Sequence, residues 1–152
     1  IFLKSNNAYE KLTQEHCLET FEIDLNNKTI IRSFLDLHRF IKKINPHIIH
    51  SWMYHADLIA SLLKPFFKDT KVIWSLHHAD PNENKWQSFL IAKICSVLSY
   101  FVPDKIIACS HIAKEGHAKF GYSDKKMILI NNGVDHEKFQ FSGRRVSTGN
   151  RE

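Results

Sequence analysis

Cysteine, glycine, proline and long apolar runs are all scarce in this sequence of 152 residues. The three cysteines, Cys17, Cys95 and Cys109, are odd in number and form no CxxC pair. This pattern excludes a disulfide scaffold and favours free thiols in a reducing cytoplasm. Five glycines and four prolines exclude a collagen-like or low-complexity chain. No run of about 18 uncharged apolar residues is present, so no membrane-spanning helix is expected.

An initiator methionine is also lacking, because the chain begins at Ile1 and its only methionines are Met53 and Met127. The first residues contain no apolar segment of the kind found in secretory signals. We therefore expect a piece of a longer cytoplasmic product, which could also act at the inner face of the membrane.

Several motifs that would indicate other functions are missing. There is no GxGxxG after a strand, no GxxxxGK[ST] and no GxSxG, which disfavours a dinucleotide-binding oxidoreductase, a P-loop enzyme and an α/β-hydrolase. There is no HExxH and no cysteine–histidine pairing at zinc spacing, so we expect no metal site, although His50, His55, His77 and His78 are conceivable ligands.

Charge is only mildly unbalanced, with 21 Lys and Arg against 16 Asp and Glu and a net charge of +5. The basic residues are spread along the chain and do not form blocks interleaved with aromatic residues. This excess suits an anionic substrate or a membrane surface and is not typical of a nucleic-acid-binding protein.

The hydrophobic pattern alternates short β-branched runs with longer helical stripes. Strands are predicted near residues 21–25, 47–52, 72–76, 105–109 and 127–130, with a further strand at 1–3 followed by a helix at 9–17. Successive strands start about 22 to 33 residues apart, which leaves room for one crossover helix between each pair. We therefore predict an α/β fold with an open parallel sheet, Rossmann-like, and helices on both faces.

Local signals mark the ends of the predicted helices. Pro46 ends the helix that follows residue 30, and Pro103 ends the longest helix, which begins near residue 86. Ser110 stands at an N-cap position and Gly121 at a left-handed C-terminal position of the next helix. In the longest helix we interpret the stripe of large apolar residues as core, with a membrane surface as the second choice. It comprises Leu90, Ile94, Val97, Leu98 and Phe101, and Phe89 and Ile91 widen it.

Candidate site residues follow the strands, because ligands of open parallel sheets bind beyond the carboxyl ends of the strands. The candidates are Trp52, His55, His77, His78, Asp80, Ser110, Asn132 and Gly133. His77 and His78 are adjacent in an extended segment, so at most one of them enters a cleft. Hydrogen bonds at a solvated rim are the alternative for these histidines, and packing at the sheet edge is the alternative for Trp52. Asp57 is interpreted as an acidic first-turn residue favoured by the helix dipole.

Four segments together resemble family 4 glycosyltransferases. Residues 46–57 (PHIIHSWMYHAD) are similar to a PDIVH segment of that family, and residues 72–78 (VIWSLHH) to a strand that ends in histidine. Residues 105–110 (KIIACS), followed by His117 and Gly121, resemble a third unit. Residues 130–135 (INNGVD) with Phe139 are close to the family's NGVD segment, with Asn131 in place of proline.

The resemblance implies one half of a GT-B architecture, in which two Rossmann-like domains face each other. Residues 1–141 would be the amino-terminal, acceptor-side domain without its first strand and glycine-rich loop, and residues 142–152 a flexible tail or the start of a linker. The implied partners are a carboxy-terminal donor-binding domain and a sugar or lipid-linked acceptor, with peripheral membrane contact and no nucleic acid.

The same resemblance implies a reaction and the residues that carry it out. The parent enzyme would move a sugar from a nucleoside diphosphate sugar to a hydroxyl, with retention, in polysaccharide or glycolipid synthesis and without a metal or other cofactor. The family's strand-end histidine corresponds best to His78, with His77 as the register alternative, and Asn132 and Gly133 would lie at the cleft floor. We expect the fragment alone to be inactive.

Three rivals belong to other classes. The main one is a non-catalytic Rossmann-like module that binds a partner or ligand, as a truncated paralogue would. The second is a flavodoxin- or receiver-like single domain, but receivers require clustered acidic residues at the end of the first strand, and this sequence shows none. A sugar-nucleotide epimerase of GT-B architecture would act on the donor alone.

Overall fold

The computed structural model describes residue 21 and residues 29–78 and 86–133. Within them lies a parallel sheet of β1 (Ile48–Trp52), β2 (Lys71–Leu76), β3 (Lys105–Ala108) and β4 (Met127–Leu129), in the order β1-β2-β3-β4. Four of the predicted strands are thus confirmed to within one or two residues at each end. The predicted elements at residues 1–3, 9–17 and 22–25 lie outside the described residues.

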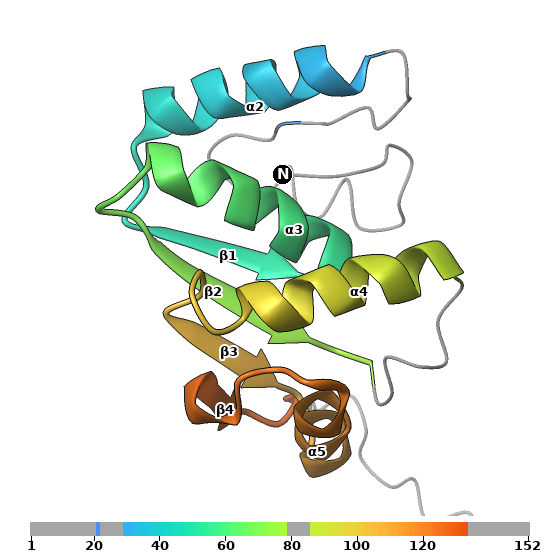
Figure 1. The fold of residues 1–152 in the computed structure, drawn as a ribbon. Coiled ribbons are helices and arrows are strands. Elements are labelled where there is room, and N and C mark those ends of the chain that lie inside the picture. The colour runs from blue at the N-terminus through green and yellow to red at the C-terminus, as the bar shows by residue number, and fades with distance from the viewer. Residues whose placement is uncertain (1–20, 22–28, 79–85, 134–152) are drawn as a thin grey trace, which may run out of the picture.

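Helices alternate with these strands (Figure 1). They are α2 (Ile30–Ile44), α3 (Tyr54–Leu63), α4 (Trp86–Leu98) and α5 (His111–Phe120), with short 3₁₀ turns at Lys64–Phe66 and Asp124–Lys126. Since α3, α4 and α5 each join neighbouring parallel strands in the same direction, right-handed crossovers place all three on one face of the sheet. The Rossmann-like α/β class is confirmed. The prediction that helices also cover the second face of the sheet is not tested by the described residues.

The core lies between the sheet and this helical layer. The register pairs Ser51 with Trp74 and Trp74 with Ile106, so alternate residues of neighbouring strands share one face. That face is buried; its members include Val72, Trp74, Leu76, Ile106, Ala108 and Met127. A second, smaller cluster of Leu37, Ile41 and Leu63 fixes α2 against α3. Burial of this face holds the carboxyl ends of the strands in one row.

The prediction that the large apolar stripe of α4 is core is wrong for most of its members. Leu90, Ile94, Val97 and Phe101 are 43–79% exposed, whereas the buried positions of α4 are Ala92, Cys95 and Ser96. The prediction holds for Leu98, Phe89 and Ile91, which are partly buried and pack against the core. Small side chains let α4 approach α3 closely. Because the helix is apolar nearly all round, periodicity could not identify its inner face.

The predicted ends of α2 and α5 are confirmed, whereas α4 ends at Leu98, several residues before Pro103. The hydroxyl of Ser110 accepts a hydrogen bond of 3.1 Å from the amide of Ala113, and Gly121 ends α5 with φ of 116°. Helix α2 ends before Pro46, with Asn45 in the left-handed conformation at φ of 49°. These caps set the length of each helix and hence where each following strand begins.

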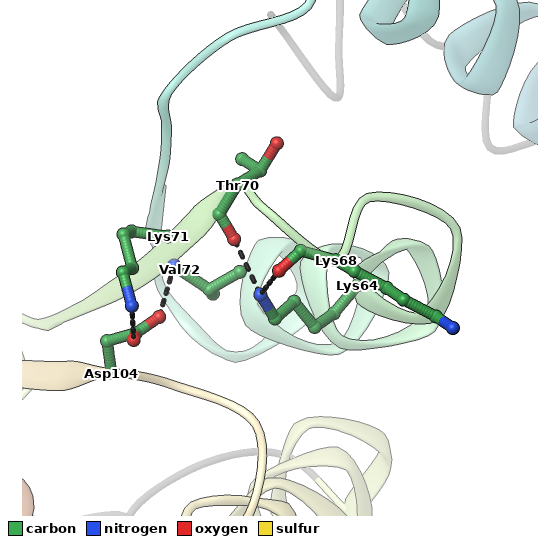
Figure 2. Close-up of polar contacts among 6 residues, drawn as sticks. All are labelled: Lys64, Lys68, Thr70, Lys71, Val72 and Asp104. Carbon is green, nitrogen blue, oxygen red and sulfur yellow. Dashed lines mark hydrogen bonds and ion pairs between the residues drawn. The ribbon is translucent and has the colours of Figure 1, made fainter.

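At the amino edge of the sheet, Asp104 joins β2 to β3 (Figure 2). Its carboxylate accepts from the amide of Val72 at 2.9 Å and pairs with Lys71 Nζ at 3.0 Å. Partial desolvation acts to raise the pKa of Asp104, but the Val72 amide and the charges of Lys71 and Lys64 hold it below its ordinary value. Lys64 Nζ in turn donates to the carbonyls of Lys68 and Thr70, at 2.9 and 2.6 Å.

None of the described helices is both long enough and apolar enough to cross a bilayer.

Candidate functional site

Four strand ends bring the predicted site residues to a single edge of the sheet. Trp52 ends β1, His77 and His78 follow β2, and Ser110 follows β3. Asn132 and Gly133, both exposed, follow β4. Because the strands are parallel and adjacent, these residues lie in one row along the carboxyl edge. Asp80, the remaining candidate of this group, lies outside the described residues.

The turn from β1 into α3 is a single residue with strained backbone. Met53 has φ of 73° and ψ of 157°, a region that non-glycine residues rarely adopt, and its amide donates to the carbonyl of Ser75 at 3.1 Å. This turn directs Trp52 to one side of the sheet and Tyr54 to the other. Strain of this kind is often found at functional edges, and here it fixes two aromatic rings beside the ends of β1 and β2.

His77 and His78 lie on opposite sides of the sheet edge, as expected for adjacent residues of an extended segment. The ring of His78 stacks with Tyr54, with centroids 6.5 Å apart and planes 25° apart. His77 lies beside Trp52 at 5.7 Å. Both histidines are exposed. The two rings therefore offer imidazole on each side of the edge, one next to α3 and one over the sheet face that α3 to α5 leave uncovered.

Beneath His78, a buried chain of hydrogen bonds ties Tyr54 to α5. The Tyr54 hydroxyl lies 2.8 Å from His117 Nε2, and His117 Nδ1 lies 2.7 Å from the carbonyl of Ala113. A carbonyl only accepts, so Nδ1 carries the proton and the Tyr54 hydroxyl donates to Nε2. His117 is fully buried. The sequence had shown His117 as a motif position without a role, and the structure assigns it to fixing the ring on which His78 stacks.

On the other side of the edge, His50 and Ser75 hold Trp52. Trp52 Nε1 donates to His50 Nε2 at 3.0 Å, and Ser75 Oγ lies 2.7 Å from the same nitrogen. Since indole N–H only donates, His50 Nε2 is the unprotonated nitrogen. Burial, followed by the neighbouring His77, lowers the pKa of His50. Trp52 is still 62% exposed, so its ring remains available for stacking.

Asp57 lies in the first turn of α3, as predicted, but it does not carry the negative charge that the helix dipole would favour. Asp57 is fully buried, and its Oδ1 accepts from Ser51 Oγ at 2.6 Å. Among the described residues its Oδ2 has no hydrogen-bond partner. Burial raises the pKa of Asp57 to about 8, against the opposing effect of the Ser51 bond. Asp57 is therefore largely protonated at neutral pH and joins β1 to α3 as a neutral hydrogen-bonding group.

The two remaining candidate residues, His55 and Ser110, differ in exposure and in hydrogen bonding. His55 is exposed in the first turn of α3, beside the same edge. The hydroxyl of Ser110 caps α5, so this side chain is already committed to an amide of the helix. Within the described ranges, no three His, Cys, Asp or Glu side chains are grouped so as to hold a metal ion.

Three cavities of the described structure lie away from this edge. One of about 450 Å³ is lined by His38, Lys42 and residues 66–70, and one of about 400 Å³ lies against the outer face of α5. A third, of about 330 Å³ and almost wholly apolar, lies between α2 and α3. None of these three is lined by a candidate site residue. The side chains and the topology of the carboxyl edge, and not a cavity, therefore make it the candidate site.

Comparison with known proteins shows one family. The family model described as Glycosyltransferase Family 4 matches residues 7–138. No curated protein matches the sequence.

The fold is similar to crystal structures of the Anabaena protein Alr3699/HepE, which is 13–14% identical. These are its complexes with UDP-glucose (TM-score 0.71), with UDP and glucose (0.71) and with UDP (0.73). Each likeness covers 90% of this chain but only 36–37% of the solved chain, so this chain spans little more than a third of that length.

Proposed function

This chain belongs to glycosyltransferase family 4, and on that premise we propose that it is the acceptor-side domain of a retaining hexosyltransferase. The donor is a nucleoside diphosphate sugar, and a nucleotide-sugar complex of the similar fold supports this class of donor. The acceptor is a hydroxyl of a sugar or lipid-linked sugar, in polysaccharide or glycolipid synthesis. The donor-binding domain is a separate part of a longer chain, without which residues 1–141 do not turn over, and the reaction needs no metal.

The observation that carries this proposal is the row of side chains along the carboxyl edge. An exposed imidazole, a largely exposed indole and the exposed Asn132 and Gly133 come from three different strands and meet at one edge. A stacking ring and hydrogen-bonding groups are what recognition of a sugar requires. Gly133 has open space where a Cβ would stand, which suits close approach of a ligand to the backbone.

His78 is the residue we propose to act in the reaction, by contacting the transferred sugar. Its ring is held from below by Tyr54, and Tyr54 is held by the buried His117. A prepositioned hydrogen-bond donor of this kind acts by orienting the sugar and by stabilising charge as the bond to the leaving diphosphate lengthens. Trp52, His55, His77, Asp80 and Ser110 contribute to substrate binding around it.

The proposal is tested with the longest reading frame that contains this chain. We expect that form to hydrolyse or transfer from a nucleotide-sugar and His78→Ala to lower turnover by roughly 10²–10³-fold, the size of losing one transition-state hydrogen bond. His47→Ala is the matched control, because His47 is also exposed but precedes β1 at the opposite edge of the sheet. It should leave turnover unchanged.

Two results would contradict the proposal. Equal turnover of His78→Ala and wild type would remove His78 from the reaction. Failure of every nucleotide-sugar to bind the longer form would favour the rival function, a non-catalytic module that binds a partner or ligand.

A further inference from the structure

We infer that a water molecule is bound in the core between β2, α3 and the end of α5, where Asp57, Trp74 and Tyr122 hold it. Three buried side-chain atoms have no hydrogen-bond partner among the described residues: Asp57 Oδ2, Trp74 Nε1 and the Tyr122 hydroxyl. Asp57 and Trp74 are fully buried, and Tyr122 is 2% exposed. Since an unpaired buried polar group destabilises a fold, native cores rarely contain three of them in one place.

The three side chains come from different elements but lie together. Trp74 in β2 is paired in register with Ser51 in β1, and Ser51 Oγ donates to Asp57 Oδ1 at 2.6 Å. The rings of Trp74 and Tyr122 meet edge to face, with centroids 6.5 Å apart. The contacts of Trp74 therefore lead to Asp57 on one side and to Tyr122 on the other.

Electrostatic interactions also place Asp57 near Tyr122. Burial raises the pKa of the Tyr122 hydroxyl, and the nearby Cys95, Tyr54 and Asp57 raise it further. Burial and then Asp57 likewise raise the pKa of the Cys95 thiol. The three unpaired atoms are thus neighbours that are too far apart to bond directly, the situation in which a water molecule bridges polar groups.

The hydrogen-bonding chemistry of the three groups matches one water molecule. The indole N–H of Trp74 only donates. Asp57 is largely protonated at neutral pH, because its pKa is about 8, and its Oδ1 already accepts from Ser51, which leaves Oδ2 to carry the proton. Two donors cannot satisfy each other, but a water accepts from both and donates to the oxygen of Tyr122. These three bonds are the number that a buried water typically makes.

An ion fits the same groups poorly. A cation would face an indole N–H and a neutral carboxyl, and no metal-binding group of His, Cys, Asp or Glu occurs among the described residues. An anion would need a buried basic partner, and no lysine or arginine is buried in that part of the chain. Because an unpaired buried charge is far more costly than a neutral guest, water is the ligand that these groups select.

The water site adjoins the buried pair of Tyr54 and His117. The ring of Tyr122 lies edge-on to His117, with centroids 5.1 Å apart. Cys95 Sγ donates to the carbonyl of Tyr54 at 3.5 Å. The bound water thus joins β2, α3 and the end of α5 beside the hydrogen bond that already links the two helices. It stabilises this contact whatever reaction the protein performs.

The first test is a nuclear Overhauser effect between water and the Trp74 Nε1–H, measured by NMR on this chain. A fully buried N–H exchanges slowly with solvent, so a cross peak between it and the water signal reports a bound water. We expect this cross peak for Trp74. Trp86, which is 74% exposed, is the control, because its water cross peak should arise from exchange and grow with pH.

The second test is Tyr122→Phe, which keeps the ring and removes the hydroxyl. If that hydroxyl bonds to a bound water, the variant should lower the equilibrium constant for folding roughly tenfold in urea titrations, because a buried partner is lost. A hydroxyl without any partner predicts the opposite, namely an unchanged or more stable protein. Tyr100→Phe is the matched control, since Tyr100 is 54% exposed, and it should be as stable as wild type.

Three results would each overturn the inference. They are the lack of a water cross peak at Trp74, a Tyr122→Phe variant at least as stable as wild type, and a crystal structure in which Asp57, Trp74 and Tyr122 bond to one another without a water between them. None of these measurements uses turnover, so they succeed or fail independently of the proposed function.

Discussion

Replacing Tyr54 with phenylalanine tests how much the buried hydrogen bond between Tyr54 and His117 stabilises the contact between α3 and α5. The substitution keeps the ring that stacks with His78 and removes only the hydroxyl that donates to His117 Nε2. Both residues are at most 2% exposed, so water cannot easily replace the lost donor. The substitution thus acts at the Tyr54 hydroxyl, which links α3 to α5 through His117.

The size of the effect follows from burial. Removing one partner of a buried hydrogen bond costs about 1–3 kcal/mol, more than the net worth of the bond, because the remaining group is desolvated. For a domain of this size that corresponds to a melting temperature lower by roughly 2–12 °C. The exposed Tyr100, 54% accessible, provides the matched control, and Tyr100→Phe should change the free energy of unfolding by less than about 0.5 kcal/mol.

Urea unfolding followed by tryptophan fluorescence measures this difference, since Trp74 is fully buried and reports loss of the core. A double-mutant cycle with His117→Phe isolates the pair, and we expect a coupling energy of about 0.5–3 kcal/mol. If Tyr54→Phe is as stable as Tyr100→Phe, or if the coupling is zero, the reasoning from burial to energy is refuted. The site would then rest on stacking alone.

Three further predictions concern protonation and capping. Because the folded pKa of Asp57 is about 8, above its value of 3.8 when unfolded, the native state binds the extra proton, and stability should fall as pH rises from about 4 to 8. Asp57→Asn should flatten this slope in urea titrations at several pH values, and an unchanged slope would contradict it. His50 should titrate in NMR spectra with a pKa below its ordinary value of 6.5, and His77→Ala should raise that pKa. Protonation of His50 should also break the hydrogen bond from Trp52 Nε1, which indole fluorescence would report. Ser110→Ala should cost about 1 kcal/mol in thermal unfolding and Ser110→Gly only a few tenths, whereas equal losses would argue against a capping role.

Sequence patterns alone determined the class of fold and the row of candidate residues. Short β-branched runs, the helical stripe of α2 and the cap signals at Ser110 and Gly121 are local features, and local sequence decides them because backbone sterics and capping act within a few residues. Parallel topology then follows from the crossover length, and it places the strand ends at one edge. His78 and Trp52 could therefore be placed at that edge before the tertiary structure was considered.

Other features depended on which side chains face each other across the fold. The large apolar residues of α4 have the periodicity of a core face, but the close packing of Ala92 and Cys95 turns them outward. Asp57 has the position of a helix-dipole carboxylate, but the adjacent β1 and α4 bury it and keep it protonated. The bond between Tyr54 and His117 joins residues 63 positions apart in the sequence.

In each of these cases the deciding quantity is the removal of a group from water, a property of the surrounding elements that no local pattern encodes. Composition, capping and strand spacing determined the architecture and the edge at which chemistry can occur. Tertiary packing decided which side of α4 faces solvent, which carboxyl stays neutral and which ring supports His78.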